Sequence, residues 1–349
     1  PVAMMPLLLH LQQPQRGIEV MMTPHFTSAI AAFGIVFTTY AMIVASELWF
    51  VYRKHFVESA LELRQIGDRT PSQHLRHLLF SILTLGAYDI SEHALERDEK
   101  AVGILAGIGI PVACFLHGYA GFIFGSVKAN ALWMTPLMPV IFIMSAVVSG
   151  IALCMLTYIL TMEIRKILAK RKRTQPGMRF ASMEELKGVE LNVIGITARY
   201  LLMFLIAAIS LELLDLIFRG YTAVKSWDVL RSVIYGRDFM DIFILQYGIG
   251  NLIPFILLLV PGISIPRALA SAALVLFGVF MMRWNVVIGG QAFSLSFAGY
   301  MHYHLPVIPQ DWATFKEGLL GAVAIFVLPF ILFWGITKIF PVMPEAKQE

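Results

Sequence analysis

Seven long apolar runs constrain this chain more than any other feature, because each run is long enough to cross a lipid bilayer. A transmembrane helix needs about 20 mostly apolar residues to span roughly 30 Å of hydrocarbon. Such a helix forms hydrogen bonds between its own backbone N–H and C=O groups, which lipid cannot supply. The runs cover residues 25–52, 101–127, 136–161, 190–218, 239–260, 267–289 and 317–340. We therefore predict an all-α integral membrane protein with seven complete transmembrane helices.

The composition supports the same fold class. Apolar residues make up 58% of the 349 residues and charged residues only 14%, and the mean hydropathy is +0.74. A soluble domain usually carries about 25% charged residues. The formal net charge of +4 does not indicate a nucleic-acid partner, because most Lys and Arg residues lie in two loops between apolar runs. Lipid is the expected surrounding of this chain.

The distribution of Lys and Arg predicts the orientation in the membrane, because short basic loops stay on the cytoplasmic side. Loop 53–100 holds seven Lys and Arg residues and loop 162–189 holds eight, whereas the intervening loop after the second run holds only Lys128. Both basic loops are therefore expected in the cytoplasm, and alternation places the C-terminus there too. The expected location is the cell (cytoplasmic) membrane.

The chain reads as one membrane domain, residues 25–340, followed by a tail at 341–349. Residues 1–24 are interpreted as the end of a truncated transmembrane helix and an outer loop, with 4–11 as the apolar remnant of that helix. The apolar stretch 75–90 is short and is followed by a charged run, so we expect a helix lying at the cytoplasmic interface.

The cysteines and histidines predict no metal or haem centre within this chain. Cys114 and Cys154 both lie in apolar runs, and no CxxC or CxxCH motif is present. A membrane b-type haem needs two histidines at similar depth on different helices, and only His117 lies well inside a run.

Ionisable residues in the apolar runs are costly, so each is a candidate for function. His117, Gly121 and Gly125 are four residues apart and share one helix face, with Tyr119 offset from it. Two interpretations stay open for His117. It is either a packing histidine bonded to a nearby carbonyl, or a proton acceptor and hydrogen-bond donor to a lipid-soluble carbonyl compound such as a quinone.

In the fourth run, Asp215 is expected to pair with Arg219 four residues later. Glu212 has no such neighbour, so proton conduction and a buried ion pair are both open for it. Glu47 in the first run either snorkels or carries protons, and Arg199 is expected to snorkel to the cytoplasm.

Arg283 lies too deep in the sixth run to reach the interface, so we expect a carboxylate partner, Glu212 or Asp215. The fifth run predicts a broken or kinked helix that either lines a polar cavity or is a kink stabilised by its neighbours. The residues that carry this prediction are Gln246, Gly248, Gly250, Asn251 and Pro254.

Three segments together resemble the NrfD/polysulfide-reductase membrane-subunit family. They are residues 109–125 (GIPVACFLHGYAGFIFG), 136–150 with its SAVVSG ending, and 283–287 (RWNVV). Residues 10–16 (HLQQPQR) are similar to a helix end in that family that commonly reads Asp-Leu-Gly-Arg-Pro. His10 stands where an Asp is frequent and Gln13 where an Arg is frequent. The long loop and the FPVMP segment at 340–344 look closer to the hydrogenase-type and sulfite-reduction branches.

The resemblance implies two four-helix bundles with flanking helices and a role in anaerobic respiration or sulfur metabolism. It implies menaquinone or another quinone held by His10, Gln13, Arg16, His117 and Tyr119 near the outer face. It also implies a ferredoxin-like iron–sulfur subunit as partner, with a multihaem cytochrome c and further membrane subunits as additional candidates. The chain would be a subunit of a membrane-bound oxidoreductase that is not catalytic alone.

Two functions therefore stand side by side. The first is a quinone-interacting electron-transfer subunit. The second is a proton translocator, with a path along Glu47, Glu212, Asp215, Arg283, Gln246 and Asn251. A third reading, a purely structural anchor, would need no bound quinone.

Overall fold

The computed structural model describes residues 17, 19–25, 27–67, 70–173, 189–222, 227–291 and 306–337. These residues form helices and turns, and none of them lies in a β-strand. Seven of their helices are long and apolar enough to cross a membrane, which confirms the predicted multi-pass membrane protein. The predicted ends at residues 1–16 and 338–349 lie outside the described residues.

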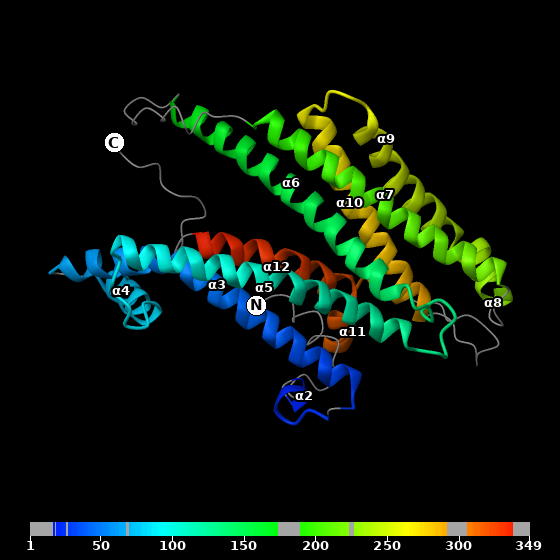
Figure 1. The fold of residues 1–349 in the computed structure, drawn as a ribbon, viewed down its shortest axis with the longest axis horizontal. Coiled ribbons are helices and arrows are strands. Elements are labelled where there is room, and N and C mark those ends of the chain that lie inside the picture. Colours follow the sequence, from blue (N-terminus) through cyan, green and yellow to red (C-terminus); the bar gives the residue numbers. More distant parts are fainter. Residues whose placement is uncertain are drawn as a thin grey trace. The chain divides into compact units, whose positions relative to one another are not determined.

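The chain divides into two compact units, Val20–Ala120 and Gly121–Glu349, the latter joined by Pro1–Glu19. Figure 1 shows the course of the helices along the chain. The two-bundle arrangement implied by the resemblance stays a prediction, and each unit is described by itself.

The first unit is built on α3 (Ala29–Gln65), α4 (Pro71–Leu83) and most of α5 (Glu92–Gly125). Arg53 on α3 is buried and forms an ion pair of 2.6 Å with Asp98 on α5. Its guanidinium also donates to the carbonyl of Asp89 at 2.6 Å, in the connection between α4 and α5. One arginine therefore joins two helices and a loop of this unit.

A helix is present where the interfacial helix was predicted at 75–90, but it begins earlier and ends earlier, at Pro71–Leu83. Thr70 caps it in a capping box with Gln73, and Pro71 stands in the first turn, where its missing N–H costs nothing. Phe80 is fully buried, and the indole of Trp49 donates to the carbonyl of Leu83 at 2.8 Å. The helix begins with a polar cap rather than with the apolar run, which is why apolarity alone misplaced its bounds.

Several helices also extend beyond the apolar runs. The first reaches Gln65, α5 starts at Glu92, and α6 (Met138–Arg173) continues through the basic segment. The predicted loops 53–100 and 162–189 are therefore partly helical. Apolarity marks the part of a helix inside the membrane, whereas Lys, Arg and Glu are good helix formers that let it continue in water.

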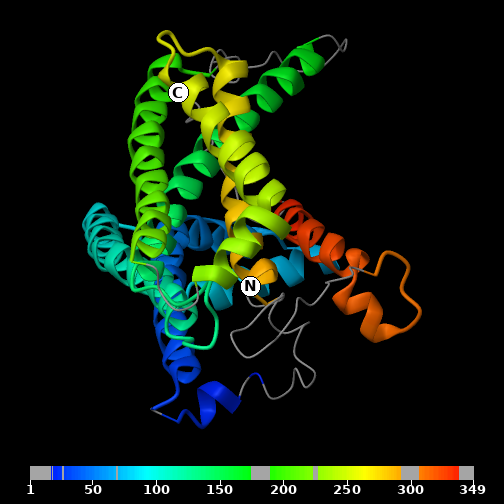
Figure 2. The same cartoon turned by 90° about the vertical axis from the view of Figure 1, so that its right-hand side faces the viewer.

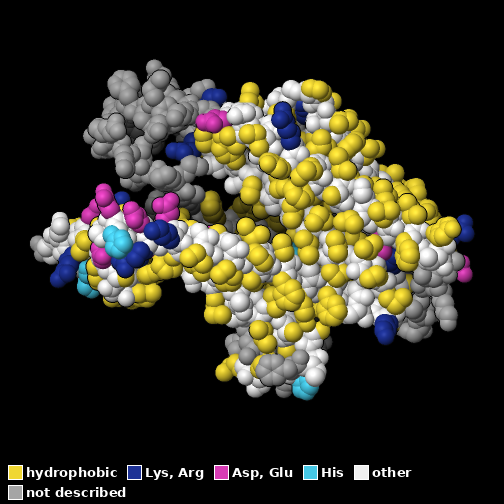
Figure 3. Space-filling model, viewed as in Figure 1, with side chains coloured by type: hydrophobic (Ala, Val, Ile, Leu, Met, Phe, Trp, Pro, Cys, Tyr) yellow, Lys and Arg dark blue, Asp and Glu magenta, His cyan; other side chains and the backbone are white. Residues whose placement is uncertain are grey.

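The second unit contains a bundle of four spans: α6, α7 (Leu191–Tyr221), the pair η4 (Met240–Leu252) with α9 (Ile253–Leu259), and α10 (Ile265–Trp284). Neighbouring spans contact one another around this bundle, which Figures 1 and 2 show as adjacent green, yellow and orange helices. Its core consists of aliphatic side chains and alanines, including Val148, Ala152, Leu201, Leu205 and Val275. Hydrophobic side chains also cover much of the face seen in Figure 3, as a lipid-facing surface requires.

The fifth span is wound as a π-helix over Met240–Leu252 rather than broken. Pro254 lacks an N–H and so cannot donate to the carbonyl of Gly250, and the N–H of Ile253 bonds five residues back to Gly248. Gly250 packs directly on Gly278 of α10, where an added Cβ on Gly278 would stand 2.6 Å from the Gly250 carbonyl oxygen. The glycines therefore allow the wide π-helix and α10 to touch backbone to backbone.

The remaining helices of this unit are short or lie at its ends. They are α8 (Trp227–Ser232), η3 (Val233–Arg237), η5 (Asn285–Gly289), α11 (Trp312–Glu317) and α12 (Leu319–Thr337), and a one-turn α2 (Glu19–Met22) lies at the unit boundary. The segment 219–238, which separates the fourth and fifth apolar runs, is thus largely helical where it is described.

Candidate functional site

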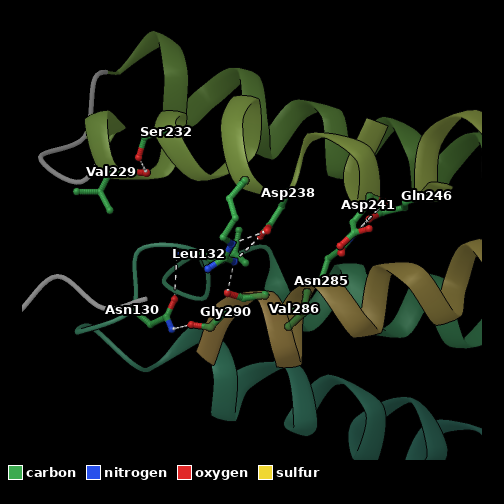
Figure 4. Close-up of polar contacts among 12 residues, drawn as sticks. Asn130, Leu132, Val229, Ser232, Asp238, Asp241, Gln246, Asn285, Val286 and Gly290 are labelled. Atoms are coloured by element: carbon green, nitrogen blue, oxygen red, sulfur yellow. Dashed lines mark hydrogen bonds and ion pairs between the residues drawn. The ribbon is translucent and has the colours of Figure 1, made fainter. Parts of the chain in front are cut away.

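A row of hydrogen-bonded polar side chains crosses the interior of the four-span bundle. Gln246 of η4 donates from Nε2 to Oε2 of Glu212 on α7 at 2.9 Å. Asn285 at the start of η5 donates from Nδ2 to Oε1 of Gln246 at 2.8 Å and to the carbonyl of Asp241 at 3.3 Å. Figure 4 shows Asn285 and Gln246 directed at each other from two neighbouring helices. A carboxylate in the membrane interior is thereby held by a chain of amides.

Glu212 lies between two cavities of the bundle. The larger, about 110 Å³, has mostly apolar walls, and its polar lining comes from Glu212, Asp215, Arg219, Gln246, Tyr247 and Asn285. The smaller, about 10 Å³, is lined by Ser145, Asn251 and Glu212 among apolar residues. A buried water needs roughly 10–15 Å³ and two to four polar partners. The small cavity therefore suits one water, and the large one suits several.

Asp215 and Arg219 form the predicted pair, with the Arg219 Nε atom 2.9 Å from Asp215 Oδ2. Arg219 also donates to the carbonyls of Ala131 at 2.6 Å and Leu132 at 3.2 Å. Thr135 donates to the other carboxylate oxygen at 2.6 Å. These contacts bind the end of α7 to the segment that precedes α6, so the pair has a structural role.

Arg283 forms no direct ion pair among the described residues, but Glu212, one of its two predicted carboxylate partners, lies close enough to interact with it electrostatically. Arg283 instead donates to the hydroxyl of Ser145 at 2.7 Å and to the carbonyl of Phe142 at 3.3 Å. Its guanidinium lies 3.7 Å from the centre of the Phe142 ring. A carbonyl dipole, a hydroxyl and an aromatic face therefore contact the half-buried cation directly, and the Glu212 carboxylate acts on it from a greater distance.

The bundle brings together five of the six residues predicted for a proton path: Glu212, Asp215, Gln246, Asn251 and Arg283. The sixth, Glu47, lies half-buried on α3 in the other unit. Sequence reasoning missed Tyr247, Asn285 and Ser145 as members of this site. Asn285 and Ser145 stand inside the segments that carried the family resemblance, which was the available signal.

At the η5 end of the bundle, a second set of polar side chains hydrogen-bonds to backbone carbonyls. Asn130 donates to the carbonyl of Gly290 at 2.6 Å, and Trp133 donates to that of Val286 at 2.5 Å. Arg237 donates to Gly289 at 3.0 Å while it pairs with Asp238 at 2.6 Å. Figure 4 shows Asn130 directed at the Gly290 carbonyl at the end of the span. These bonds satisfy carbonyls that a helix end leaves free.

His117 and Tyr119 lie on α5 in the first unit. Tyr119 is half-buried and stacks on Phe33 with ring centres 6.4 Å apart, and it contacts Phe115 at 5.8 Å. His117 is exposed. Three residues of the predicted quinone pocket, His10, Gln13 and Arg16, lie outside the described residues.

Gly121 and Gly125, which share a helix face with His117 by their spacing, lie in close packing. A Cβ at Gly121 would stand 2.7 Å from the Met138 carbonyl oxygen, and one at Gly125 would stand 2.8 Å from that of Thr135.

Within the described residues, no three His, Cys, Asp or Glu side chains gather closely enough to share a metal ion.

Fold and site together define a multi-pass helical membrane protein with a buried polar cluster in one of its bundles. The chain belongs to the NrfD family, since the family model described as "Polysulphide reductase, NrfD" matches residues 1–295. This confirms the family inferred from the three sequence segments.

Three curated relatives match over much of the chain. A selenate reductase subunit of Mesobacillus selenatarsenatis is 26% identical over 98% of this chain and 74% of its own length. A putative dimethyl sulfoxide reductase membrane subunit of Halobacterium salinarum is 25% identical over 88% and 60%. An Hdr-like menaquinol oxidoreductase integral membrane subunit of Archaeoglobus fulgidus is 24% identical over 73% and 61%. The chain thus spans about three fifths of the last two proteins.

Proposed function

We propose that this chain is the quinone- or quinol-interacting membrane subunit of an oxidoreductase complex and exchanges electrons with an iron–sulfur partner subunit. The observation that carries the proposal is the family match over residues 1–295. The relatives' names agree with it: two of them name a subunit of a reductase, and the third names menaquinol. The proposed setting is the cell membrane, with the C-terminus in the cytoplasm and partners such as a ferredoxin-like subunit or a multihaem cytochrome c.

The residues on α5 fit a quinone in their chemistry. His117 presents an imidazole on an exposed helix face, where a lipid-soluble molecule can reach it. Tyr119, two residues further along the same helix, packs with Phe33 and Phe115 in an aromatic group. We assign the head group to His117 and Tyr119, and the family resemblance adds His10, Gln13 and Arg16 as candidates.

A bound quinone supplies the uptake or release of two electrons and two protons. The protein's part is to hold the ring and to manage protons. An imidazole donates a hydrogen bond to a carbonyl when it carries the N–H, and it accepts a proton at its second nitrogen. In this proposal His117 orients the head group and exchanges a proton with it.

The test is electron transfer between a soluble quinol analogue and the iron–sulfur centres of the purified complex. The variant is His117→Ala, and the matched control is His93→Ala, an exposed histidine near the start of the same helix. We expect electron transfer to fall at least ten-fold in the first variant and to stay at the wild-type rate in the second. Wild-type rates in both variants, with the complex intact, would contradict the assignment to His117.

The Glu212 cluster favours a second function, the movement of protons through the four-span bundle. Glu212 is the carboxylate that borders both cavities, and waters in them would connect it to Asn251 and Ser145 on one side and to Asn285 on the other. A carboxyl group in that position can take a proton from one cavity and release it to the other. Asp215 and Arg283 shape the field around it.

Replacing Glu212 by Gln separates the two functions, because the amide keeps the hydrogen-bonding shape but carries no exchangeable acid. Complexes reconstituted in liposomes are assayed for quinone-linked electron transfer and for acidification of the lumen. We expect Glu212→Gln to keep electron transfer and to abolish proton movement. Unchanged proton movement would remove Glu212 from the path.

A further inference from the structure

A groove of about 530 Å³ runs along the outside of the four-span bundle at the end where α7 begins. Its walls are one face of α7, from Leu191 to Leu202, the last turn of α9 and the connection 260–263. Most of the lining is aliphatic, and none of the described lining residues is acidic. The groove has the size of a site for a lipid-sized molecule.

Arg199 is the charged residue in this lining. Among the described residues it forms no hydrogen bond and no ion pair, although it lies in a membrane-spanning helix. This sets it apart from the buried Arg219 and the half-buried Arg283 of the same unit, which are each bonded to other residues. A positive charge in a membrane-spanning helix needs a negative or polar partner, and the Arg199 side chain is open to the groove.

The depth of Arg199 matches the boundary between lipid heads and chains. Helix α7 has 31 residues and is about 46 Å long. If it is centred in a hydrocarbon core of roughly 30 Å, about 8 Å of the helix extends beyond the core at each end. Arg199 lies eight residues in, about 12 Å from the start. Side chains on a helix lean toward its N-terminus, so the guanidinium extends back up the groove toward the head-group layer.

The opposite wall is fixed by Arg267. Its guanidinium donates to the carbonyl of Val260 at 2.8 Å and to that of Pro261 at 3.4 Å. The connection is therefore held in place by a cation of its own, which adds positive charge near the mouth. An aliphatic channel with an open cation at head-group depth is complementary to an anionic phospholipid.

We infer that the groove binds one anionic phospholipid, with its phosphate at Arg199 and an acyl chain along the aliphatic walls of α7 and α9. Asn192, about two turns before Arg199, stands where a head-group hydroxyl or glycerol oxygen can hydrogen-bond. The inference is independent of the quinone assignment, because the groove shares no residue with the assigned quinone site.

Two variants probe the two halves of the site. Arg199→Gln removes the charge and keeps the length, with Arg199→Lys as the variant that keeps the charge. Gly195→Leu fills the channel: a Cβ at Gly195 meets no atom within 4 Å, so the added side chain occupies open groove without straining the fold. Gly150→Leu is the matched control, a glycine with the same open space on α6 and outside the groove.

The experiment exchanges the purified complex into phosphatidylcholine nanodiscs that contain phosphatidylglycerol as the minor lipid, then counts retained lipids by native mass spectrometry. We expect wild type, Arg199→Lys and Gly150→Leu to retain one phosphatidylglycerol. A single basic residue near the surface contributes about 1 kcal/mol, so Arg199→Gln should retain it about five-fold less, and Gly195→Leu should lose it. Equal retention in all variants, retention of phosphatidylcholine instead, or a quinone in its place would each overturn the inference.

Discussion

Arg219 offers the sharpest test of how the bundle is held together. Its side chain is 7% exposed and that of its partner Asp215 is 13% exposed, so the ion pair lies almost entirely inside the protein. Removing the arginine leaves one carboxylate without its cation and frees the two carbonyls of Ala131 and Leu132. Breaking a buried pair in this way costs about 3–5 kcal/mol.

The assay is the loss of monodisperse protein after heating, followed by fluorescence-detected size exclusion. The unfolding midpoint of a large domain falls by about 2–4 °C for each kcal/mol of lost stability, so Arg219→Gln should lower the midpoint temperature by about 10 °C. The control Arg231→Gln removes an exposed arginine and should shift the midpoint by about 1 °C. The double variant Asp215→Asn with Arg219→Gln should be at least as stable as Arg219→Gln alone. Equal midpoints for Arg219→Gln and Arg231→Gln would refute the reasoning.

Three further predictions follow from close contacts. Gly250→Ala forces a Cβ into the backbone of α10 and should destabilise the bundle by about 1–3 kcal/mol, whereas Gly150→Ala, in open space, should not, as the same heating assay would show. Arg53→Ala frees the connection between α4 and α5, so hydrogen exchange at residues 84–91 should accelerate. Lys54→Ala, which removes an exposed ion pair of 3.8 Å, should leave that exchange unchanged. Asn130→Ala leaves the Gly290 carbonyl unbonded and should cost about 1–3 kcal/mol in that heating assay; a neutral result would show that water replaces the amide.

The fold class and the spans could be predicted because apolar length is a direct demand of the bilayer. The bounds of the helices could not, because charged residues such as those around Glu92 and Arg173 continue a helix outside the membrane. The π-helical winding of the fifth span could not be predicted from the sequence either. Gly250 and Pro254 indicated an irregular helix, but only packing against α10 decides that it is a continuous π-helix.

The candidate site was predicted as a set of residues rather than as a geometry. The four-residue spacing of Asp215 and Arg219 gave their pair directly. Glu212, one of the two carboxylates predicted as partner of Arg283, interacts with it electrostatically. The direct contacts of Arg283 are a carbonyl, a hydroxyl and a ring, which charge balance in the sequence does not reveal. Asn285 joins the Glu212 cluster from another span through Gln246, a link that arises only in the folded bundle.

The measurement that tests the proposed quinone site most directly is labelling of the purified complex with a photoreactive quinone analogue, followed by mapping of the labelled peptides. We predict that the label falls on α5 around His117 and is displaced by excess unlabelled quinone. A displaceable label confined to the four-span bundle around Glu212, or no displaceable label on this chain, would contradict the proposal.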